Sequence, residues 1–215
     1  MRYKLAIFDL DGTILDTLDD LANSTNAALK LNSLPIRSRE EIRSFVGNGI
    51  RLLIERAVPE NTSAEVTDKV FSDFKKHYAE HCSDNTAPYE KINELLDELR
   101  EAGCKIAVVS NKADFAVQEL CNQYFPNKLD FAVGERENVR RKPAPDSVFE
   151  SMKALGIAAE ESIYIGDSDV DIETAKNANI PCISVTWGFR SKDFLIDHGA
   201  DKLVSSPDEI KNIII

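Results

Sequence analysis

The sequence predicts an α/β fold with a parallel sheet, into which a helical segment is inserted near the N-terminus. Short apolar runs of the kind that parallel sheets bury on both faces alternate with segments whose apolar residues recur at helical spacing. This alternation is typical of right-handed β–α–β crossovers. One stretch, residues 17–82, departs from it because that stretch shows helical patterns and no convincing strand.

Four apolar runs are predicted to be strands of the sheet: Lys4–Phe8, Cys104–Val109, Ser162–Ile165 and Cys182–Val185. Two segments between them have the helical period, with apolar side chains at Ile92, Leu95, Leu96 and Leu99 in the first and at Val148, Phe149, Met152 and Leu155 in the second. Gly103 and Gly156 follow these segments, and a glycine just past the last periodic residue is a typical helix end.

The inserted stretch predicts a small helical bundle. Ser38–Glu41 and Thr62–Glu65 each place a hydroxyl residue three positions before a glutamate, which is the pattern of a capping box. After the second box, one helix face is expected to carry Val66, Val70, Phe74 and Tyr78. We therefore expect an α/β core of residues 1–16 and 83–215 and a helical domain of residues 17–82.

Composition narrows the class of protein. The chain has 215 residues, of which 43% are hydrophobic, so it can bury a sizeable core. It has no apolar run long enough to span a membrane, and its N-terminal apolar run is too short for a signal peptide. The net charge of −11 disfavours nucleic acid as a partner and requires any phosphate site to be locally cationic. The four cysteines have no paired spacing, which fits free thiols in the cytoplasm.

The end of the first strand, Asp9-Leu10-Asp11-Gly12-Thr13, is the most informative segment. Side chains two residues apart on an extended strand share one face, so Asp9 and Asp11 are expected to lie close together. Two close carboxylates are costly unless a cation or a shared proton relieves them. The segment therefore predicts a metal-assisted site for phosphate, and an ordinary Asp-Gly turn is the alternative.

Two basic or hydroxyl-bearing segments follow later strands, and open parallel sheets bind their ligands at these strand ends. Ser110-Asn111-Lys112 follows Val108-Val109, where a hydroxyl before a helix serves either as a phosphoryl ligand or as a helix cap. In Lys142-Pro143-Ala144-Pro145 the prolines fix the backbone, so Lys142 is expected to point in one direction before a helix that begins near Pro145.

A third segment, Gly166-Asp167-Ser168-Asp169-Val170-Asp171, ends another strand with three carboxylates. It lacks the glycine and the distal glutamate of a calcium loop. Facing Asp9 and Asp11, it predicts a Mg²⁺ site instead, because Mg²⁺ takes few carboxylates and keeps several waters.

In this order, the four segments resemble the haloacid dehalogenase superfamily of phosphohydrolases, and the helical insertion resembles the cap of its first subfamily. The resemblance implies a Rossmann-like doubly wound parallel sheet with an inserted α-helical cap domain. It implies that Asp9 is the nucleophile and forms an aspartyl-phosphate. It also implies that Asp11 protonates the leaving oxygen and then activates water, while Ser110 and Lys142 bind the phosphoryl oxygens.

The resemblance further implies that Mg²⁺ is held by Asp9, Asp167 and the backbone carbonyl of Asp11. Asp171 is expected to orient Lys142 or a metal-bound water, and Asp169 to be a solvated residue at a helix start. The remaining expected substrate-binding residues are Gly12, Thr13 and Asn111 beside the reaction centre and Gly47, Asn48 and Gly49 in the cap.

The cap segment Phe45-Val46-Gly47-Asn48-Gly49 resembles the cap loop of phosphoglycolate phosphatases, although a break between two helices explains the glycines equally well. The resemblance therefore implies a small phosphorylated metabolite as substrate, with phosphoglycolate as the leading candidate. A pyrophosphatase or a nucleotide phosphatase remains an alternative. We expect a monomer or homodimer, with neither nucleic acid nor membrane as partner.

Two further alternatives differ in the fate of the phosphoryl group. A sugar phosphomutase of the same subfamily would have a histidine near the start of the cap, where this chain has Leu21. A non-catalytic phosphate-binding regulator would have lost part of the catalytic set, which is complete here. Outside that set, His77 and His81 lie one helical turn apart; a polar helix face is favoured over a transition-metal site because no third ligand is evident.

Overall fold

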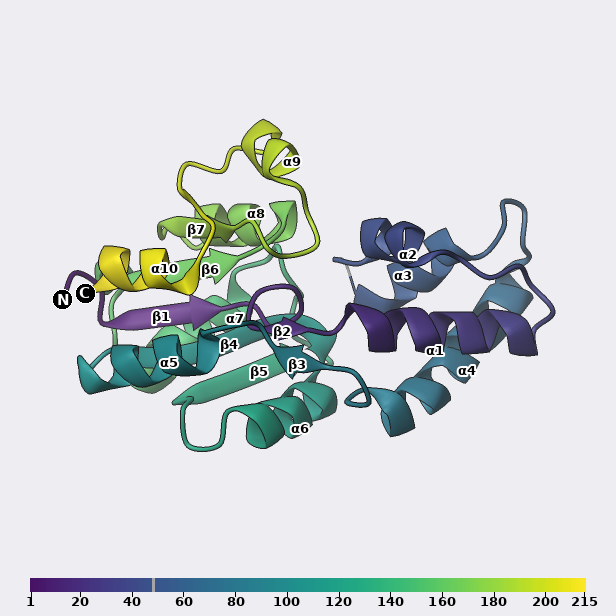
Figure 1. Ribbon diagram of the computed structural model, residues 1–215, viewed down its shortest axis with the longest axis horizontal. Helices are drawn as coiled ribbons and strands as arrows, with labels where there is room; N and C mark the ends of the chain where they lie inside the picture. Colours follow the sequence, from purple (N-terminus) through teal and green to yellow (C-terminus); the bar gives the residue numbers. More distant parts are fainter. Residues whose placement is uncertain (48) are drawn as a thin grey trace. The chain divides into compact units, whose positions relative to one another are not determined.

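The structure is a computed structural model that describes residues 1–47 and 49–215. The chain divides into two compact units. Met1–Leu15 and Pro88–Ile215 form one of them, called here the α/β unit, and Asp16–Ala87 form the other, called the helical unit. Figure 1 shows the sheet of the first and the helices of the second.

The α/β unit contains a six-stranded parallel sheet in the order β5-β4-β1-β6-β7-β8. Its strands are β1 (Leu5–Phe8), β4 (Lys105–Ala113), β5 (Phe131–Glu135), β6 (Ser162–Gly166), β7 (Cys182–Val185) and β8 (Leu203–Val204). All four residues of β1 are buried, because the strand is covered on both faces. This architecture confirms the predicted α/β fold class.

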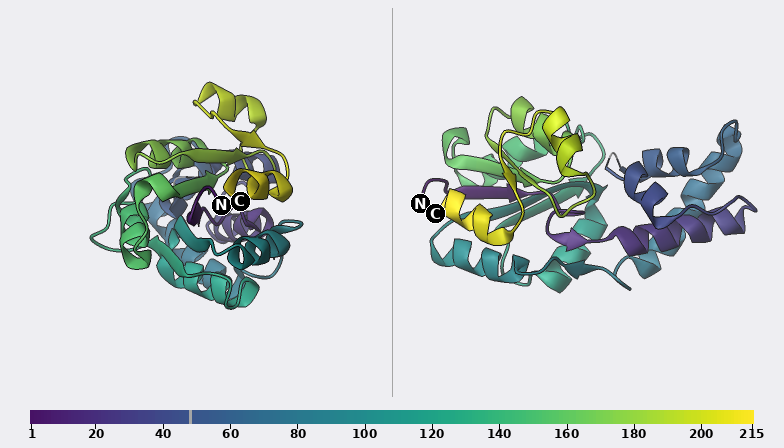
Figure 2. Two further views of the ribbon diagram at one scale, coloured as in Figure 1. Left: turned by 90° about the vertical axis from the view of Figure 1, so that its left-hand side faces the viewer. Right: turned by 45° about the horizontal axis from the view of Figure 1, so that its top comes forward.

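Helices cover both faces of the sheet (Figures 1 and 2). They are α5 (Ile92–Glu101), α6 (Asp114–Tyr124), α7 (Asp146–Leu155), α8 (Asp169–Asn177), α9 (Lys192–Asp197) and α10 (Pro207–Ile214), and a 3₁₀ turn spans Ala159–Glu161. A core cluster joins α7 and α8 to the sheet through Val148, Met152 and Ala175, which pack with Leu5 and Tyr164. On the opposite face, α5 and α10 pack against each other.

The helical unit contains α1 (Leu18–Leu31), α2 (Arg39–Phe45), α3 (Gly49–Ala57) and α4 (Ala64–His81). α1 packs on α2 and α4, and α3 packs on α2 and α4. The chain leaves the sheet through β2 (Leu15–Asp16) and returns through β3 (Ala87–Pro88), and these two strands pair with each other.

One of the two predicted capping boxes forms. Ser38 accepts a hydrogen bond from the backbone N–H of Glu41, whose carboxylate accepts one from the Ser38 N–H. The second prediction is wrong, because the helix starts one residue later than Thr62 would place it. Ser63 is the N-cap and bonds to the N–H of Val66, a position that offers no carboxylate in return.

The predicted buried faces of two helices are confirmed only in part. In α4, Val70, Phe74 and Tyr78 are buried, as expected. In α7, Val148 and Met152 are buried, but Phe149 is 48% exposed. Val148 faces the sheet, and the next residue of a helix points about 100° away from it.

Asp16 and residues 83–87 belong to the helical unit, although the predicted boundaries place them in the α/β core. For residues 83–87, the reason is a buried carboxylate on α1. Asp20 is 1% exposed and accepts hydrogen bonds from the backbone N–H groups and side chains of Asn85 and Thr86, at 2.8–3.0 Å. These bonds fasten the returning segment to the first helix. Among the described helices, none has both the length and the apolar run that a membrane span requires.

Candidate active site

The loop that follows β1 presents Asp9 and Asp11. The carbonyl of Leu10 accepts hydrogen bonds from the backbone N–H groups of Thr13, Ile14 and Leu15, so the chain turns tightly directly after the strand. Asp9 Oδ1 accepts a 2.7 Å bond from the N–H of Leu10. The turn therefore fixes the orientation of Asp9 at the carboxyl end of the central strand.

A buried lysine joins β1 to β6 and α8. The ammonium group of Lys142 lies 2.9 Å from Asp9 Oδ1 and 2.8 Å from Asp171 Oδ1, and it donates a 3.0 Å hydrogen bond to the hydroxyl of Tyr164. Its side chain is 4% exposed, and that of Asp171 is fully buried. Tyr164 is not predicted as a site residue, because its position inside an apolar strand gives no sign of a polar contact.

Asp171 has its oxygens occupied by the protein. Oδ1 accepts from Lys142 and lies 3.2 Å from the Tyr164 hydroxyl. Oδ2 accepts bonds from the N–H groups of Asp167 and Ser168 and a 2.6 Å bond from the Ser168 hydroxyl. This carboxylate thus holds both Lys142 and the turn that carries Asp167.

Burial and neighbouring charges shift the pKa values of Asp9, Asp167 and Lys142. Desolvation raises the pKa of Asp9 to about 7, against the opposing effect of Lys142. Desolvation, together with the charges of Asp171 and Asp9, raises the pKa of Asp167 well above its usual range. Burial by itself would lower the pKa of Lys142, but the charges of Asp171 and Asp9 outweigh it and raise that pKa. The cluster is therefore short of positive charge.

Asp167 lies in a close-fitting cradle. Its Oδ2 accepts a 2.7 Å bond from the N–H of Phe189, and its Oδ1 accepts a 3.2 Å bond from the hydroxyl of Thr13. A side chain at Gly12 would place its Cβ 2.5 Å from Asp167 Oδ2, and one at Gly188 would also collide with Asp167. Both backbones come this close only because these two residues have no side chain.

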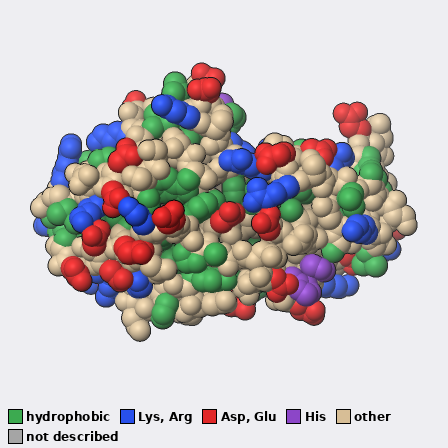
Figure 3. All heavy atoms as spheres, viewed as in Figure 1, with side chains coloured by type: hydrophobic (Ala, Val, Ile, Leu, Met, Phe, Trp, Pro, Cys, Tyr) green, Lys and Arg blue, Asp and Glu red, His purple; other side chains and the backbone are tan. Residues whose placement is uncertain are grey.

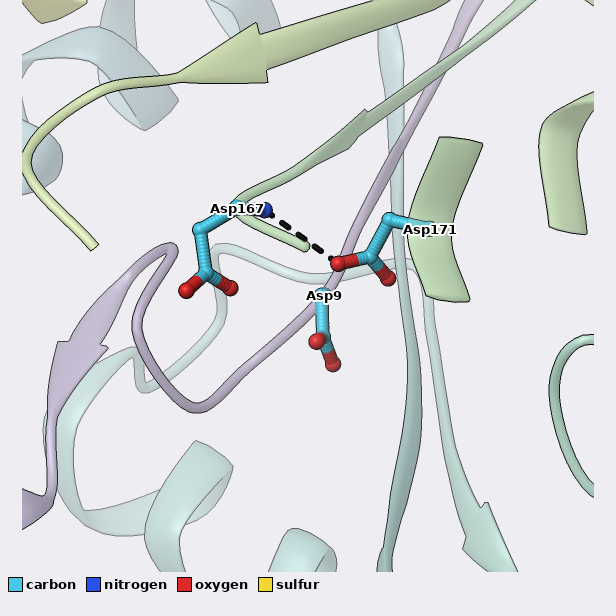
Figure 4. Close-up of side chains that lie close together, drawn as sticks. All are labelled: Asp9, Asp167 and Asp171. Carbon is cyan, nitrogen blue, oxygen red and sulfur yellow. Dashed lines mark hydrogen bonds between the residues drawn. The ribbon is translucent and has the colours of Figure 1, made fainter. Parts of the chain in front are cut away.

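Three carboxylates converge at this point (Figure 4). Asp9, Asp167 and Asp171 each offer an oxygen within 4.8 Å of the others. Oxygen ligands of this kind suit Mg²⁺, and a divalent cation would offset the uncompensated negative charge. Since both oxygens of Asp171 are occupied, Asp9 and Asp167 fit better as metal ligands. The donor set is thus compatible with the expected metal.

Ser110, Asn111 and Lys112 lie in an irregular part of β4. Val109 pairs with Val133 of β5, but the next pair is Ala113 with Glu135, so β4 has more residues than its partner here. Such a bulge redirects side chains near a strand end. The strand therefore runs through Ser110–Lys112, beyond the predicted end at Val109, and α6 begins directly after it.

The bulge brings a second buried lysine to the site. Lys112 Nζ donates a 2.9 Å hydrogen bond to Asp11 Oδ1, and the lysine side chain is 2% exposed. No role is predicted for Lys112 from the sequence. Alternate residues of a regular strand share a face, but the bulge interrupts this alternation, so the spacing of Lys112 from Ser110 does not predict the contact.

Asn111 supports the Lys142 loop, because its Nδ2 donates a 3.0 Å bond to the carbonyl of Lys142. Ser110 is 6% exposed and lines a small pocket with Asn111 and Lys142. The same pocket is lined by Arg136, Arg140 and Arg141. Glu135 also lines the pocket, and Arg136 and Arg140 pair with Glu150 and Asp146, so carboxylates offset part of this positive charge.

The other predicted residues lie apart from this cluster or in the other unit. Asp169 begins α8 with its side chain 33% exposed and lies 3.7 Å from Arg190. Gly47 and Gly49 belong to the helical unit, and both have positive φ angles. Asn48 lies outside the described residues.

Comparisons with known proteins identify the family of this chain. Residues 6–185 match the family model described as haloacid dehalogenase-like hydrolase. A phosphoglycolate phosphatase of Nitrosococcus oceani is 28% identical over 216 residues, covering 98% of this chain and 96% of that protein. The phosphoglycolate phosphatase of Pseudomonas syringae pv. tomato is 31% identical over 192 residues, covering 86% of this chain and 70% of that protein.

A crystal structure from Lactobacillus delbrueckii subsp. bulgaricus, provisionally described as a phosphoglycolate phosphatase, is 39% identical with a TM-score of 0.94. The match covers 100% of this chain and 99% of that one. The chain therefore belongs to the haloacid dehalogenase-like hydrolases. Within that family it is similar to the phosphoglycolate phosphatases, which confirms the resemblance found in the sequence.

Proposed function

We propose that this hydrolase is a Mg²⁺-dependent phosphatase that cleaves a small phosphate monoester through a phosphorylated Asp9. The observation that carries this proposal is the buried cluster in which Lys142 lies 2.9 Å from Asp9 and the carboxylate of Asp167 converges on the same point. Relatives named phosphoglycolate phosphatase support the class of phosphoric monoester hydrolases.

In the first step, an Asp9 oxygen bonds to phosphorus as the bond from phosphorus to the leaving oxygen breaks. The protein contacts of Asp9 fall on Oδ1, so we assign the attack to Oδ2. Asp11 gives its proton to the leaving oxygen. In the second step, water attacks phosphorus, Asp11 takes the proton of that water, and the bond between phosphorus and Asp9 breaks to release phosphate.

Charge neutralisation is the main contribution of the surrounding residues, since phosphoryl transfer depends on it more than on covalent chemistry. Lys142 and the Ser110 hydroxyl bind the phosphoryl oxygens, and Asn111, Gly12 and Thr13 shape the pocket around them. Asp9, Asp167 and the backbone carbonyl of Asp11 would hold Mg²⁺, which supplies positive charge beside the phosphoryl group. Asp171 keeps Lys142 in place.

Phosphoglycolate is the leading candidate for the substrate. The relatives carry this name, and the glycines at 47 and 49 suit a close approach of backbone to a small anion. We assign the helical unit the role of a cap that reads the leaving group and excludes bulk water while the phosphorylated Asp9 forms. A pyrophosphatase, a nucleotide phosphatase, a sugar phosphomutase or a non-catalytic regulator remains the alternative.

The test is phosphate release from phosphoglycolate, pyrophosphate, nucleoside monophosphates and hexose phosphates, each with Mg²⁺ and with EDTA. We expect Mg²⁺-dependent turnover with one substrate far ahead in kcat/KM. Asp9→Asn should abolish turnover while the circular dichroism spectrum stays unchanged. Turnover in that variant would refute the nucleophile, and release from no substrate would favour the mutase or the regulator.

We also place the protein in the cytoplasm, supported by its four free cysteines, Cys82, Cys104, Cys121 and Cys182. Its state as a monomer or homodimer stays a prediction that light scattering would test.

A further inference from the structure

Two histidines on α4 form a pair outside the proposed active site. His77 and His81 lie one helical turn apart, and their ring centroids are 4.3 Å from each other. Histidine side chains gather in an exposed group over this helix (Figure 3). The His81 side chain is 43% exposed, and that of His77 is partly exposed. A solvent ion can therefore reach both rings.

Each ring uses Nδ1 for a hydrogen bond to the protein. His81 Nδ1 lies 2.7 Å from Asp84 Oδ2, and His77 Nδ1 lies 3.0 Å from the hydroxyl of the buried Ser24 on α1. An ionised carboxylate only accepts, so Asp84 places the proton of His81 on Nδ1. The Nε2 atom of the neutral ring then carries the lone pair that binds metals.

We propose that His77 and His81 form a binding site for one late first-row transition metal ion, held by the two Nε2 atoms. Imidazole suits Ni²⁺, Cu²⁺ and Zn²⁺, whereas Mg²⁺ prefers oxygen. Among the residues that the structure describes, the only group of three possible ligands is the carboxylate cluster at β1, so water completes the coordination here.

The surroundings favour the neutral state of His77. Burial lowers the pKa of His77, and the neighbouring His81 lowers it further. Asp84 and Ser24 come from outside α4 and fix the two ring planes before an ion arrives. At known metal sites, removing a hydrogen-bond partner of a ligating histidine lowers metal affinity by about 10–100-fold.

The first test is calorimetric titration of the untagged protein with Ni²⁺ at pH 7.5, in excess Mg²⁺ so that the carboxylate cluster is occupied. We expect one Ni²⁺ per chain. His77→Gln and His81→Gln should each weaken binding by at least about tenfold, and Asp84→Asn by about tenfold. The control is His198→Gln, which removes the remaining histidine of the chain and should leave the affinity unchanged.

The second test needs no variant. The electron paramagnetic resonance spectrum of one equivalent of Cu²⁺, again in excess Mg²⁺, should show two imidazole nitrogens as ligands. A spectrum with oxygen ligands only, or Ni²⁺ affinity unchanged in a His77→Gln/His81→Gln double variant, would overturn the site. Unchanged affinity in Asp84→Asn would overturn the role given to Asp84.

Discussion

Lys112 Nζ lies 2.9 Å from Asp11 Oδ1, and this pair connects the bulge of β4 to the loop after β1. The lysine side chain is 2% exposed and that of Asp11 is 17% exposed, so solvent screens the pair only weakly. Asp11 is the proposed proton donor, and its carboxylate must keep one orientation in both steps. Lys112 is therefore positioned to hold it.

Replacing this lysine should impair the chemical step. We expect Lys112→Met to lower kcat by about tenfold, which is less than the roughly 100-fold or more that general acid–base catalysis contributes, because Asp11 itself remains, and to change KM less. Lys112→Arg should recover part of the loss. The control is Lys105→Met on the same strand, because that lysine is 53% exposed and pairs at the surface with Asp130. Steady-state kinetics with the best substrate measures all three, and equal loss in the control would contradict the assignment.

Removing the other buried lysine should destabilise the fold. Lys142→Met leaves the carboxylates of Asp9 and Asp171 without their cation, and breaking a buried pair costs about 3–5 kcal/mol. Protonation of Asp9, whose pKa is already about 7, limits the loss. Urea unfolding in EDTA measures the change, with the exposed Lys153→Met as control. A loss below about 1 kcal/mol, the scale of a surface pair, would argue against a strongly coupled cluster.

Two adjacent aspartates on α1 should differ sharply in how much they contribute to the free energy of unfolding. Asp20→Ala removes the acceptor of the backbone N–H groups of Asn85 and Thr86, and we expect it to cost about 3 kcal/mol. Asp19→Ala removes only a surface pair with Arg39, with the aspartate 53% exposed, and should cost less than about 1 kcal/mol. Urea unfolding compares them, and similar costs for both variants would refute the fastening of residues 83–87 by Asp20.

The buried cysteines should resist alkylation. Burial raises the pKa of Cys104 from 9.0 to about 11 and that of Cys121 to about 12. Because the thiolate is the reactive form, raising the pKa of Cys104 from 9.0 to about 11 lowers the thiolate population at pH 8 about 100-fold. Mass spectrometry after iodoacetamide treatment at pH 8 should show much slower labelling of both in native protein than in urea. Equal rates would contradict the burial of these thiols.

Much of the α/β unit could be predicted because its central strands are apolar on both faces. β7 has the predicted bounds, and β1 and β6 differ from theirs by one residue. β5 and β8 were missed for different reasons. β5 is an edge strand that contains Gly134 and ends in Glu135, so its pattern is not continuous, and β8 has only two residues.

Asp9, Asp11 and Ser110 could be found from sequence because they follow recognisable apolar runs. Lys142 lies in the loop beyond β5 and is indicated instead by Pro143 and Pro145. The contacts that hold these residues could not be predicted. Tyr164 is hidden within an apolar run, and the cradle formed by Gly188 and Phe189 needs the register of β6 with β7. Lys112 reaches Asp11 through a bulge, and a bulge depends on the pairing of two strands rather than on the residues of one.

The central position of β1 has a consequence for synthesis on the ribosome. Leu5 pairs with Lys105 and with Ser162, so β1 emerges before both of its neighbours. The helical unit, Asp16–Ala87, is complete long before either neighbour is made. Until β4 and β6 arrive, the apolar strand that bears Asp9 has unpaired edges, and such edges invite aggregation. The order of translation thus leaves β1 unpaired while most of the chain is made, so protection of this strand from aggregation matters during synthesis.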